Sequence, residues 1–433
     1  MADPRIVPRD QHVISRRDID PDALKVLYRL REANHKAYLV GGSVRDLLLA
    51  RKPKDFDVGT SAHPYQVKKL FRNCWIIGRR FRLAHVRFGA KVIEVATFRR
   101  QVAPGEEVVQ DGVPAPDPST DEGQHLIHRD NTFGTPEEDA FRRDFTINAL
   151  FYDIATFSVI DYVNGLDDLR ARIVRSIGNP DVRLREDPVR MLRAIALAAR
   201  LDFTIEPTLL AAIRTHRHEI AKSAAPRVLE ELYKILRAGS AERAFRSLAA
   251  VGILELTAPE LDKLYNVNGA AVEGLWRSLA ALDAYRRRFE STPETLTNTI
   301  LLGTLLVPIG VPLGEQDARG DVGATPRLGS LPLARKDIER LRQILGLQRR
   351  LRDSSASVRA QRALVHRHIF REAMTWLEIH GHAPALVEHW RALAAEVPES
   401  GAGTQAGQPA EESVPQPFGR RRRRRRRRRL GLR

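Results

Sequence analysis

One stretch of the 433-residue chain constrains its fold more than any other. Residues 39–60 read LVGGSVRDLLLARKPKDFDVGT, which is an apolar run, a Gly-Gly-Ser turn, a helical pattern and two aspartates separated by one residue. An apolar run that stops at glycines and passes into a helical pattern indicates a buried strand followed directly by a helix. The sequence therefore predicts an α/β layer in which a strand, a tight turn and a helix meet.

The Gly-Gly turn has the properties of a phosphate-binding site. Gly41 and Gly42 carry no side chains, so an anion can approach the backbone closely, and the predicted helix begins with free N–H groups. Arg45 adds a positive charge on the first turn of that helix. We predict that the triphosphate of a nucleotide binds here.

Two aspartates, Asp55 and Asp57, follow in a segment predicted to be a short strand. Because side chains alternate between the faces of a strand, carboxylates two residues apart point the same way and can share two Mg²⁺ ions. Such a pair supports in-line attack on a phosphate. An isolated acidic pair is more often the solvated end of a strand, but the GGSVRD motif nine residues earlier favours the metal site.

Two other acids are candidates for a third carboxylate. Glu94 is a charged residue inside the apolar run VIEVATF, where it either binds metal or lies on an edge strand that faces water. Asp144, in FRRDFTINAL, is the competing acid. The residues alone leave this choice open.

Two polar clusters follow the acids along the chain. In FRRDFTINAL, Arg143 is placed to hold phosphate, and the alternative is a capped helix start with an exposed arginine. In REDPVRMLRAI, Asp187, Arg190 and Arg193 are spaced at i,i+3, which puts them on one face of a helix. They can present acceptors and donors to the edge of a base, or form a salt bridge on a solvated face.

Hydrophobic periodicity predicts the surrounding elements. Asp20 as the N-cap and Pro21 at the first helical position indicate a helix that continues to about residue 33. Residues 85–88 and 92–98 are typical of a hairpin. From about residue 181 the strand signals fade and Ala, Leu and Arg dominate, so we predict a helical second half.

Five motifs in order along the chain, LVGGSVRD, DFD, IEVATFRR, RRDFTINAL and EDPVRMLR, resemble those of class II nucleotidyltransferases. This family contains the CCA-adding enzymes and the bacterial poly(A) polymerases, and the resemblance covers residues 37–200. It implies an α+β fold, with a small mixed-sheet nucleotidyltransferase head followed by an all-helical neck, body and tail. The expected division is an N-terminal extension (1–20), a catalytic head (21–170), a nucleotide-recognising neck (171–238), an RNA-binding body and tail (239–397), and a disordered tether with an arginine-rich end (398–433).

The resemblance also implies roles for single residues. It implies that Asp55, Asp57 and Glu94 bind the catalytic metal ions and that Asp144 is an essential acid. It implies that Gly42, Arg45 and Arg143 contact the triphosphate and the sugar. It implies that Asp187, Arg190 and Arg193 select the base. One departure puts a supporting contact in doubt, because many relatives carry Arg-Phe where this chain has Ala196-Leu197.

Residues 76–89, IIGRRFRLAHVRFG, favour one branch of the family. The run resembles the segment that marks bacterial poly(A) polymerases, whereas CCA-adding enzymes tend to be less basic here. Its arginines, Arg79, Arg80 and Arg82, are expected to follow RNA phosphates or to restrict the choice of base. The alternative is a basic hairpin on the surface.

The charge of the chain points to an anionic partner. There are 71 Lys+Arg against 54 Asp+Glu, a net charge of +17, and ten of the arginines form the unbroken run 420–429. Without that run the balance is 61 against 54, or +7. An arginine run suits RNA contact that is independent of sequence, because neutralised phosphates release counterions whatever the base. A localisation signal or protein-docking tail is the alternative.

The remaining composition bears on the compartment. Cys74 is the single cysteine, no apolar stretch approaches the length of a membrane span, and the N-terminus lacks the apolar core of a signal peptide. We therefore expect a soluble, cytoplasmic, monomeric protein that does not act at a membrane.

These features predict a polynucleotide adenylyltransferase. We expect it to add AMP from ATP to RNA 3′ ends without a template, to release pyrophosphate, to use two Mg²⁺ ions, and to act in RNA processing with RNA-decay proteins as candidate partners. A CCA-adding tRNA nucleotidyltransferase is the first alternative. The second is an RNA-binding protein whose head has lost catalysis.

Overall fold

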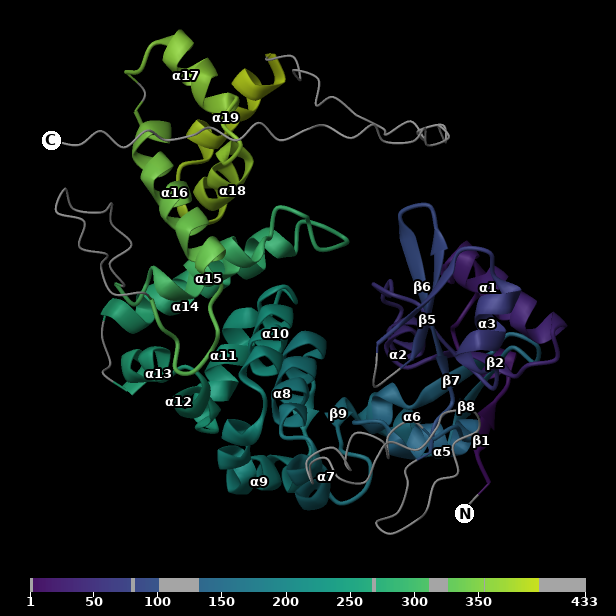
Figure 1. Cartoon of the computed structure of the whole chain (residues 1–433). Helices are drawn as coiled ribbons and strands as arrows, with labels where there is room; N and C mark the ends of the chain where they lie inside the picture. Colours follow the sequence, from purple (N-terminus) through teal and green to yellow (C-terminus); the bar gives the residue numbers. More distant parts are fainter. Residues whose placement is uncertain are drawn as a thin grey trace, which may run out of the picture.

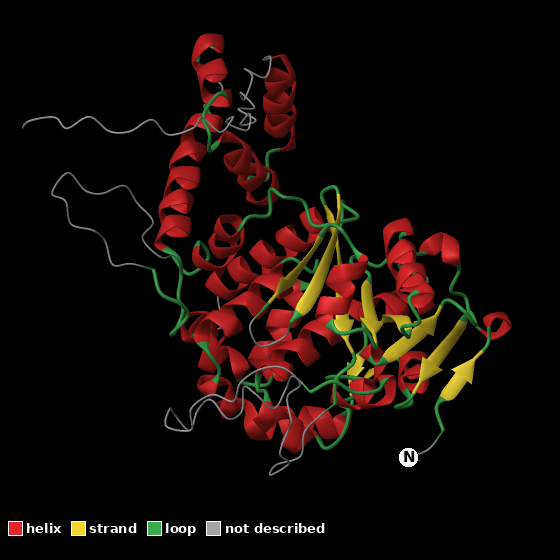
Figure 2. Ribbon diagram, turned by 45° about the vertical axis from the view of Figure 1, so that its right-hand side comes forward, coloured by secondary structure: helices red, strands yellow, loops and turns green. Residues whose placement is uncertain are grey.

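The computed structural model of the chain describes residues 3–78, 82–100, 132–266, 270–310, 326–353 and 355–396. An N-terminal mixed sheet with its covering helices is followed by a helical array (Figure 1). Figure 2 shows the strands gathered on one side of the molecule while helices fill the rest. The predicted α+β class is confirmed. The tether and arginine run predicted for 398–433 lie outside the described residues.

The sheet has eight strands. They are β1 (Arg5–Val7), β2 (Ala37–Val40), β3 (Asp57–Thr60), β4 (Cys74–Ile77), β5 (Leu83–Phe88), β6 (Lys91–Thr97), β7 (Leu150–Asp153) and β8 (Ser158–Asp161), in the spatial order β1-β8-β7-β2-β3-β6-β5-β4. Strands β3 and β6 run parallel, and all other neighbours in this sheet are antiparallel. The predicted 85–98 hairpin is the pair β5 and β6.

The helices of the head cover the sheet. They are α1 (Pro21–Glu32), α2 (Gly42–Leu48), α3 (Pro64–Leu70), α5 (Pro136–Arg142) and α6 (Gly165–Ala171). Helix α1 begins as predicted, since the Asp20 carboxylate accepts hydrogen bonds from the N–H groups of Asp22 and Ala23.

The rest of the chain forms the helical array. Its helices are α7 (Pro180–Glu186), α8 (Val189–Leu201), α9 (Pro207–His216), α10 (Ala225–Leu236), α11 (Ala241–Ala250), α12 (Ile253–Thr257), α13 (Pro259–Asn266), α14 (Ala270–Arg286), α15 (Asn298–Leu306), α16 (Arg335–Leu351), α17 (Val358–Val365), α18 (Phe370–His380) and α19 (Pro384–Glu396). The two-residue strands β9 (Ile173–Val174) and β10 (Thr204–Ile205) pair where the array joins the head. No helix in the described ranges has the length and apolar character needed to cross a bilayer.

The two faces of the sheet are packed differently. Helices α1 and α3 contact β2 through β6 on one face, where Leu39, Val58 and Val95 are fully buried. On the other face a second core cluster, which includes Val40, Phe98 and Phe151, covers the middle of the sheet.

Two predicted elements differ from the structure. Strand β3 begins at Asp57, so Asp55 lies in the preceding loop, because the partner strand β2 ends where Val40 pairs with Asp57 and the chain turns into α2. The predicted single helix through 186–193 is also wrong. Asp187 adopts an extended conformation between α7 and α8, as expected of a residue that precedes a proline, here Pro188.

We expect Gly59→Ala in β3 to destabilise the protein. A Cβ at this position would lie 2.6 Å from Phe98 Cε1 and 2.9 Å from Val40 Cγ1, so the second core cluster must shift, at a cost of about 1–3 kcal/mol. Urea denaturation measures the change. The matched control is Gly346→Ala in α16, where nothing lies within 4 Å of the new Cβ, and we expect it to stabilise by up to about 1 kcal/mol. Equal effects of the two substitutions would contradict the packing argument.

Candidate active site

The parallel pairing of β3 and β6 brings Asp57 and Glu94 together. Val58 pairs with Val95, so Asp57 and Glu94, each one residue earlier, are neighbours on adjacent strands. Adjacent strands lie about 4.8 Å apart, and both side chains point away from the face that α1 and α3 cover. Two carboxylates far apart in the sequence are therefore side by side.

The surroundings of Asp57 disfavour its ionised form. Burial of the carboxyl among protein atoms raises its pKa to about 6, with Glu94 and Asp55 raising it further and Arg143 opposing them. The residue lies at the start of β3 and is nevertheless exposed to solvent, so protein atoms crowd the carboxyl without enclosing it. Its carboxylate makes no hydrogen bond or ion pair within the described part of the chain, so it is available to a cation.

Asp55 and Glu94 are only loosely held. Asp55 lies 3.6 Å from Lys54 Nζ with 72% of its side chain exposed, and Glu94 lies 3.6 Å from His85 Nε2 with half of its side chain exposed. Across the described ranges, no three His, Cys, Asp or Glu side chains are close enough to hold one metal ion. The donors suit Mg²⁺, which prefers carboxylate oxygens, but Asp55 has to turn toward Asp57 to complete a set of three.

The Gly-Gly turn lies next to these carboxylates. Gly41 has φ of +71°, and a Cβ there would lie 2.9 Å from Arg143 Nη1, so the turn requires glycine. Arg143 is fixed beside the turn by Asp139, at 2.9 Å, and by the carbonyl of Asn148, at 3.2 Å. The structure thus brings together Gly42, which begins α2, Arg143 and Asp57.

Arg45 lies beneath the turn and is not presented to solvent. Its side chain is 3% exposed, and its guanidinium donates to the side chains of Asp46 and Asn148. Burial lowers its pKa to about 10, while Asp46 counteracts that shift. A direct contact between Arg45 and triphosphate stays a prediction. In this structure the residue supports the turn.

Asp144 joins the head to the neck helix α8. Its Oδ1 accepts a hydrogen bond from Arg190 Nε at 2.7 Å, and its Oδ2 accepts one from Arg193 Nη1 at 2.8 Å. Burial favours the neutral acid, but the two guanidinium groups hold the pKa of Asp144 below its ordinary value. The charged neighbours of Asp57 are Glu94, Arg143 and Asp55, so the structure does not group Asp144 with them.

The three predicted base-selecting residues lie close to Asp144 but are engaged with other partners. Asp187 accepts from Arg227 Nη2 at 2.6 Å, and Arg190 also donates to the carbonyl of Arg183 at 2.8 Å. Asp187 and Arg190 form no ion pair with each other among the described contacts. Arg193 also contacts Glu231 on α10 at 3.3 Å.

Several residues that hold the site in place are not evident from the sequence. Arg183 is buried and donates to the carbonyls of Arg142 and Arg143, and Glu231 is buried beside Arg193. Only Asp139 carried a local signal, because it stands four residues before Arg143 on a helix. The others meet through tertiary contacts between distant segments.

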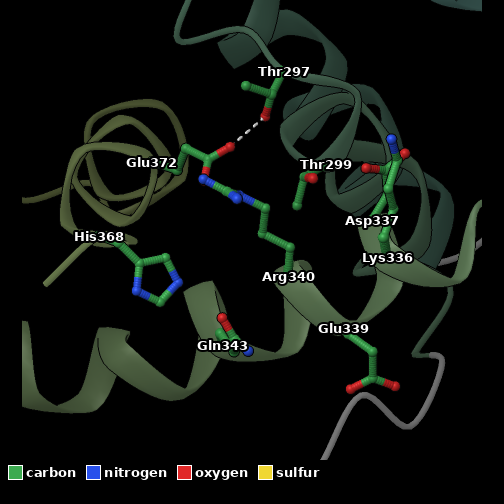
Figure 3. Close-up of a pocket in the computed structure, with 9 residues that line it drawn as sticks. All are labelled: Thr297, Thr299, Lys336, Asp337, Glu339, Arg340, Gln343, His368 and Glu372. Carbon is green, nitrogen blue, oxygen red and sulfur yellow. Dashed lines mark hydrogen bonds and ion pairs between the residues drawn. The ribbon is translucent and has the colours of Figure 1, made fainter. Parts of the chain in front are cut away.

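A cavity of about 550 Å³ lies elsewhere, between α15, α16 and α18 (Figure 3). Its buried carboxylate, Glu372, is paired with Arg340 and accepts a hydrogen bond from Thr297 at 2.9 Å. The chain itself neutralises this carboxylate, so Glu372 differs from Asp57, which makes no ion pair within the described residues.

The segments that carry these residues are similar to known protein families. Residues 37–175 match the model of the poly A polymerase head domain, and residues 202–265 match a probable RNA- and SrmB-binding site of polymerase A. Residues 323–429 match an arginine-rich C-terminus of polymerase A. These three segments of the chain match models of the poly(A) polymerase family.

Relatives from both branches of this family are similar to the chain. Poly(A) polymerase I of Salmonella typhi is 49% identical over 265 residues, which are 61% of this chain and 55% of the relative. A CCA-adding enzyme of Lactobacillus johnsonii is 36% identical over 233 residues, 54% of each chain. The chain thus spans about half the length of the curated relatives it matches.

A solved structure extends the similarity over more of the chain. The Bacillus stearothermophilus CCA-adding enzyme in complex with CTP has a TM-score of 0.58 and 25% identity, and covers 87% of this chain and 83% of its own. The head and the helical array therefore share the fold of this family.

We expect Asp57→Asn to stabilise the metal-free protein at pH 7.5. Since the pKa of Asp57 is about 6 in the folded protein and its ordinary value is 3.8, ionisation favours unfolding as the pH rises through 6. Thermal unfolding in EDTA should show a higher Tm for the variant at pH 7.5 and no difference below pH 3.8. Asp55→Asn, at a mostly exposed position, is the control and should shift the Tm less. A lower Tm for Asp57→Asn at pH 7.5 would contradict the electrostatic argument.

Asp144→Asn should have the opposite effect and destabilise the protein at neutral pH. Loss of the charge removes the carboxylate that Arg190 and Arg193 share and leaves them only their weaker contacts with Glu186 and Glu231, which we expect to cost about 2 kcal/mol at pH 7. Because the folded pKa of Asp144 is lowered, the wild type loses this advantage as the pH falls through that pKa, so the gap to the variant should narrow below pH 3.8. Urea denaturation at several pH values tests this. Asp167→Asn, an exposed partner of Arg5, should have little effect at any pH.

Proposed function

We propose that the chain is a template-independent polynucleotide adenylyltransferase, which adds AMP from ATP to RNA 3′ ends and releases pyrophosphate. One observation carries this proposal. Asp57 and Glu94 stand in register on the parallel strands β3 and β6, next to the Gly41-Gly42 turn and Arg143. Adjacent carboxylates beside a backbone that can receive phosphate suit phosphoryl transfer.

In this proposal the residues of the head bind the phosphates and the metal ions. Gly42 lets the triphosphate approach the backbone, and Arg143 offers a guanidinium to phosphate and sugar. Asp55, Asp57 and Glu94 hold two Mg²⁺ ions, which when bound stabilise the charge that develops on the phosphates. Asp57 has to be ionised for this, so activity should fall as the pH drops below about 6.

The neck residues select the base in this proposal. Asp187, Arg190 and Arg193 offer acceptors and donors on rigid elements, and Asp144 positions the two arginines through its paired oxygens. Both arginines are held before a nucleotide arrives, so their orientation costs little when it binds. Arg45 supports the Gly-Gly turn from beneath.

The choice of adenylate rests on the relatives. The matched relatives named poly(A) polymerase I are 40–49% identical, against 36–38% for the CCA-adding enzymes, and the arginine-rich C-terminus model is a polymerase A feature. The CCA-adding activity remains the second candidate, because the enzyme that resembles the chain over 87% of its length is of that kind. The third reading, an RNA-binding protein without catalysis, is disfavoured by the free carboxylate of Asp57.

The setting of the reaction is also part of the proposal. We assign the reaction to the cytoplasm, with RNA 3′ ends and ATP as substrates, RNA-decay proteins as candidate partners, and a monomer as the active species. The units are the head at 21–170, the neck at 171–238, the RNA-binding body and tail at 239–397, and the terminal extensions at 1–20 and 398–433. The arginine run gives the chain sequence-independent affinity for RNA.

The reaction can be tested with purified protein. Unstructured RNA and tRNA lacking CCA are incubated with ATP alone or with ATP and CTP, and the products are separated on gels. We expect ATP alone to extend unstructured RNA into a poly(A) ladder. Addition of C, C and A restricted to tRNA would establish the CCA-adding alternative instead.

The site is tested by a double substitution. Asp55→Ala with Asp57→Ala should lower the extension rate at least about a hundredfold, because the developing charge loses its stabilisation. The control is Asp167→Ala, an exposed aspartate on α6, which should leave the rate unchanged. Extension by the double variant at the wild-type rate would rule out the proposed site.

A further inference from the structure

Within the described residues, helices α1 and α3 cover only one face of the outer strands β4, β5 and β6, and the other face is called here the open face. Helices α1 and α3 cover the face that buries Ala84, Val86 and Ile93, and Figure 1 shows these helices on one side of β5 and β6. The opposite side chains of β4 are Trp75 and Ile77, each 51% exposed. The half-exposed ring of Trp75 and the neighbouring Ile77 are therefore accessible to another molecule on this face.

The strand register connects this surface to the carboxylates. Trp75 is opposite His85, His85 is opposite Glu94, and Glu94 is the neighbour of Asp57. The four side chains therefore form a row on the same face, across β4, β5, β6 and β3. At about 4.8 Å per strand, the row measures about 14 Å from Trp75 to Asp57.

The nucleotide site lies at the other end of this row. Val40 pairs with Asp57 on the side away from Glu94, and the Gly41-Gly42 turn follows Val40 directly. An in-line reaction brings its two substrates to the phosphate from opposite directions. If the triphosphate occupies the β2 side of Asp57, the RNA has to approach from the side of β6, β5 and β4.

The open face has the chemistry of a single-stranded nucleic acid platform. An exposed aromatic ring can stack on a base of any identity, and an adjacent arginine can pair with the phosphate. Arg87 is exposed on the same face of β5, two residues from His85. The combination of ring and cation beside the carboxylates favours RNA over a purely apolar partner.

We propose that the open face of β4–β6 binds the RNA 3′ end, with a base stacked on Trp75 and the backbone beside Arg87. The inference rests on the proposed function and adds the place and orientation of the RNA. His85 and Glu94 lie between Trp75 and Asp57, so the stacked base belongs to a nucleotide upstream of the reacting 3′-OH.

Binding is measured first, without catalysis. The full chain is titrated into a short fluorescently labelled oligoadenylate in EDTA, and anisotropy gives the Kd. Trp75→Ala should raise the Kd about tenfold or more, whereas Trp75→Phe should retain most of the affinity. Because the arginine run is present in every variant, its contribution cancels in the comparison.

The matched control is Tyr65→Ala, an aromatic residue 59% exposed on α3, which covers the other face of the sheet. We expect its Kd to equal that of wild type. Trp75→Leu keeps the site apolar without the ring and should bind as weakly as Trp75→Ala, which guards against a folding defect in the alanine variant. Circular dichroism and Tm verify that each variant is folded.

Salt dependence separates the two contacts. Replacement of Trp75 removes stacking but no charge, so the slope of log Kd against log salt should stay at the wild-type value. Arg87→Ala should lower the magnitude of that slope by about one phosphate contact. An unchanged slope for Arg87→Ala would remove the backbone contact from the proposal.

Extension assays then test the link to the reaction. Trp75→Ala should raise the KM for RNA and leave the KM for ATP unchanged.

If wild type extends RNA and Trp75→Ala binds it as Tyr65→Ala does, the platform is wrong and the proposed function stands. If wild type extends nothing while Trp75→Ala still loses RNA binding, the proposed function is wrong and the platform stands. A change from dimer to monomer at Trp75→Ala, with unchanged RNA affinity, would assign the face to a second copy of the chain and overturn the proposal.

Discussion

The pairing of β3 with β6 is the contact on which the candidate site depends. It is the one parallel pair in the eight-stranded sheet, and it places Asp57 beside Glu94 although 37 positions separate them in the chain. Burial of the Asp57 carboxyl disfavours its charge, and repulsion from the neighbouring Glu94 adds to the cost, so the pKa of Asp57 rises to about 6. The fold tolerates this because the strands on either side are anchored by α1 and α3 and by the second core cluster. A bound cation would relieve the repulsion, which is the physical reason to expect one here.

The second organising contact is the ion cluster between the head and the neck. Asp144 accepts from Arg190 and Arg193, and Arg193 continues to Glu231 on α10. Partly buried charges are costly unless each is paired, so the cluster fixes the orientation of α8 relative to the head. The residues proposed to read the base are thereby held in relation to the residues proposed to bind the phosphates. Selection and reaction can be coupled in this way without a nucleic-acid template.

Local sequence signals predicted the elements of the head well. The capped start of α1, the strand β2, the 85–98 hairpin and the helical second half were confirmed, because each depends on contacts between residues close in the chain. The errors came where a partner far away decides the outcome. The pairing of β3 with β2 begins at Asp57, because β2 ends at Val40. Asp55 is therefore left in the loop before β3. The pairing of buried Arg45 with Asn148, more than one hundred positions later, likewise gave no signal in the sequence, and the contact between Arg45 and triphosphate stays a prediction.

The sequence by itself determined which chemical groups are present and where the local turns fall. The Gly-Gly turn, the acidic pair and the arginine run are properties of short segments, and in the turn glycine permits the local backbone. Only the tertiary structure decided which of these groups meet. Strand register set Glu94 next to Asp57 and Trp75 on the same face as the carboxylates, and contacts with α8 paired Asp144 with Arg190 and Arg193. Two strands can pair in many registers, and the register that forms is the one that buries the apolar face of each strand. It depends on residues far apart in the chain, so a local sequence pattern does not specify it.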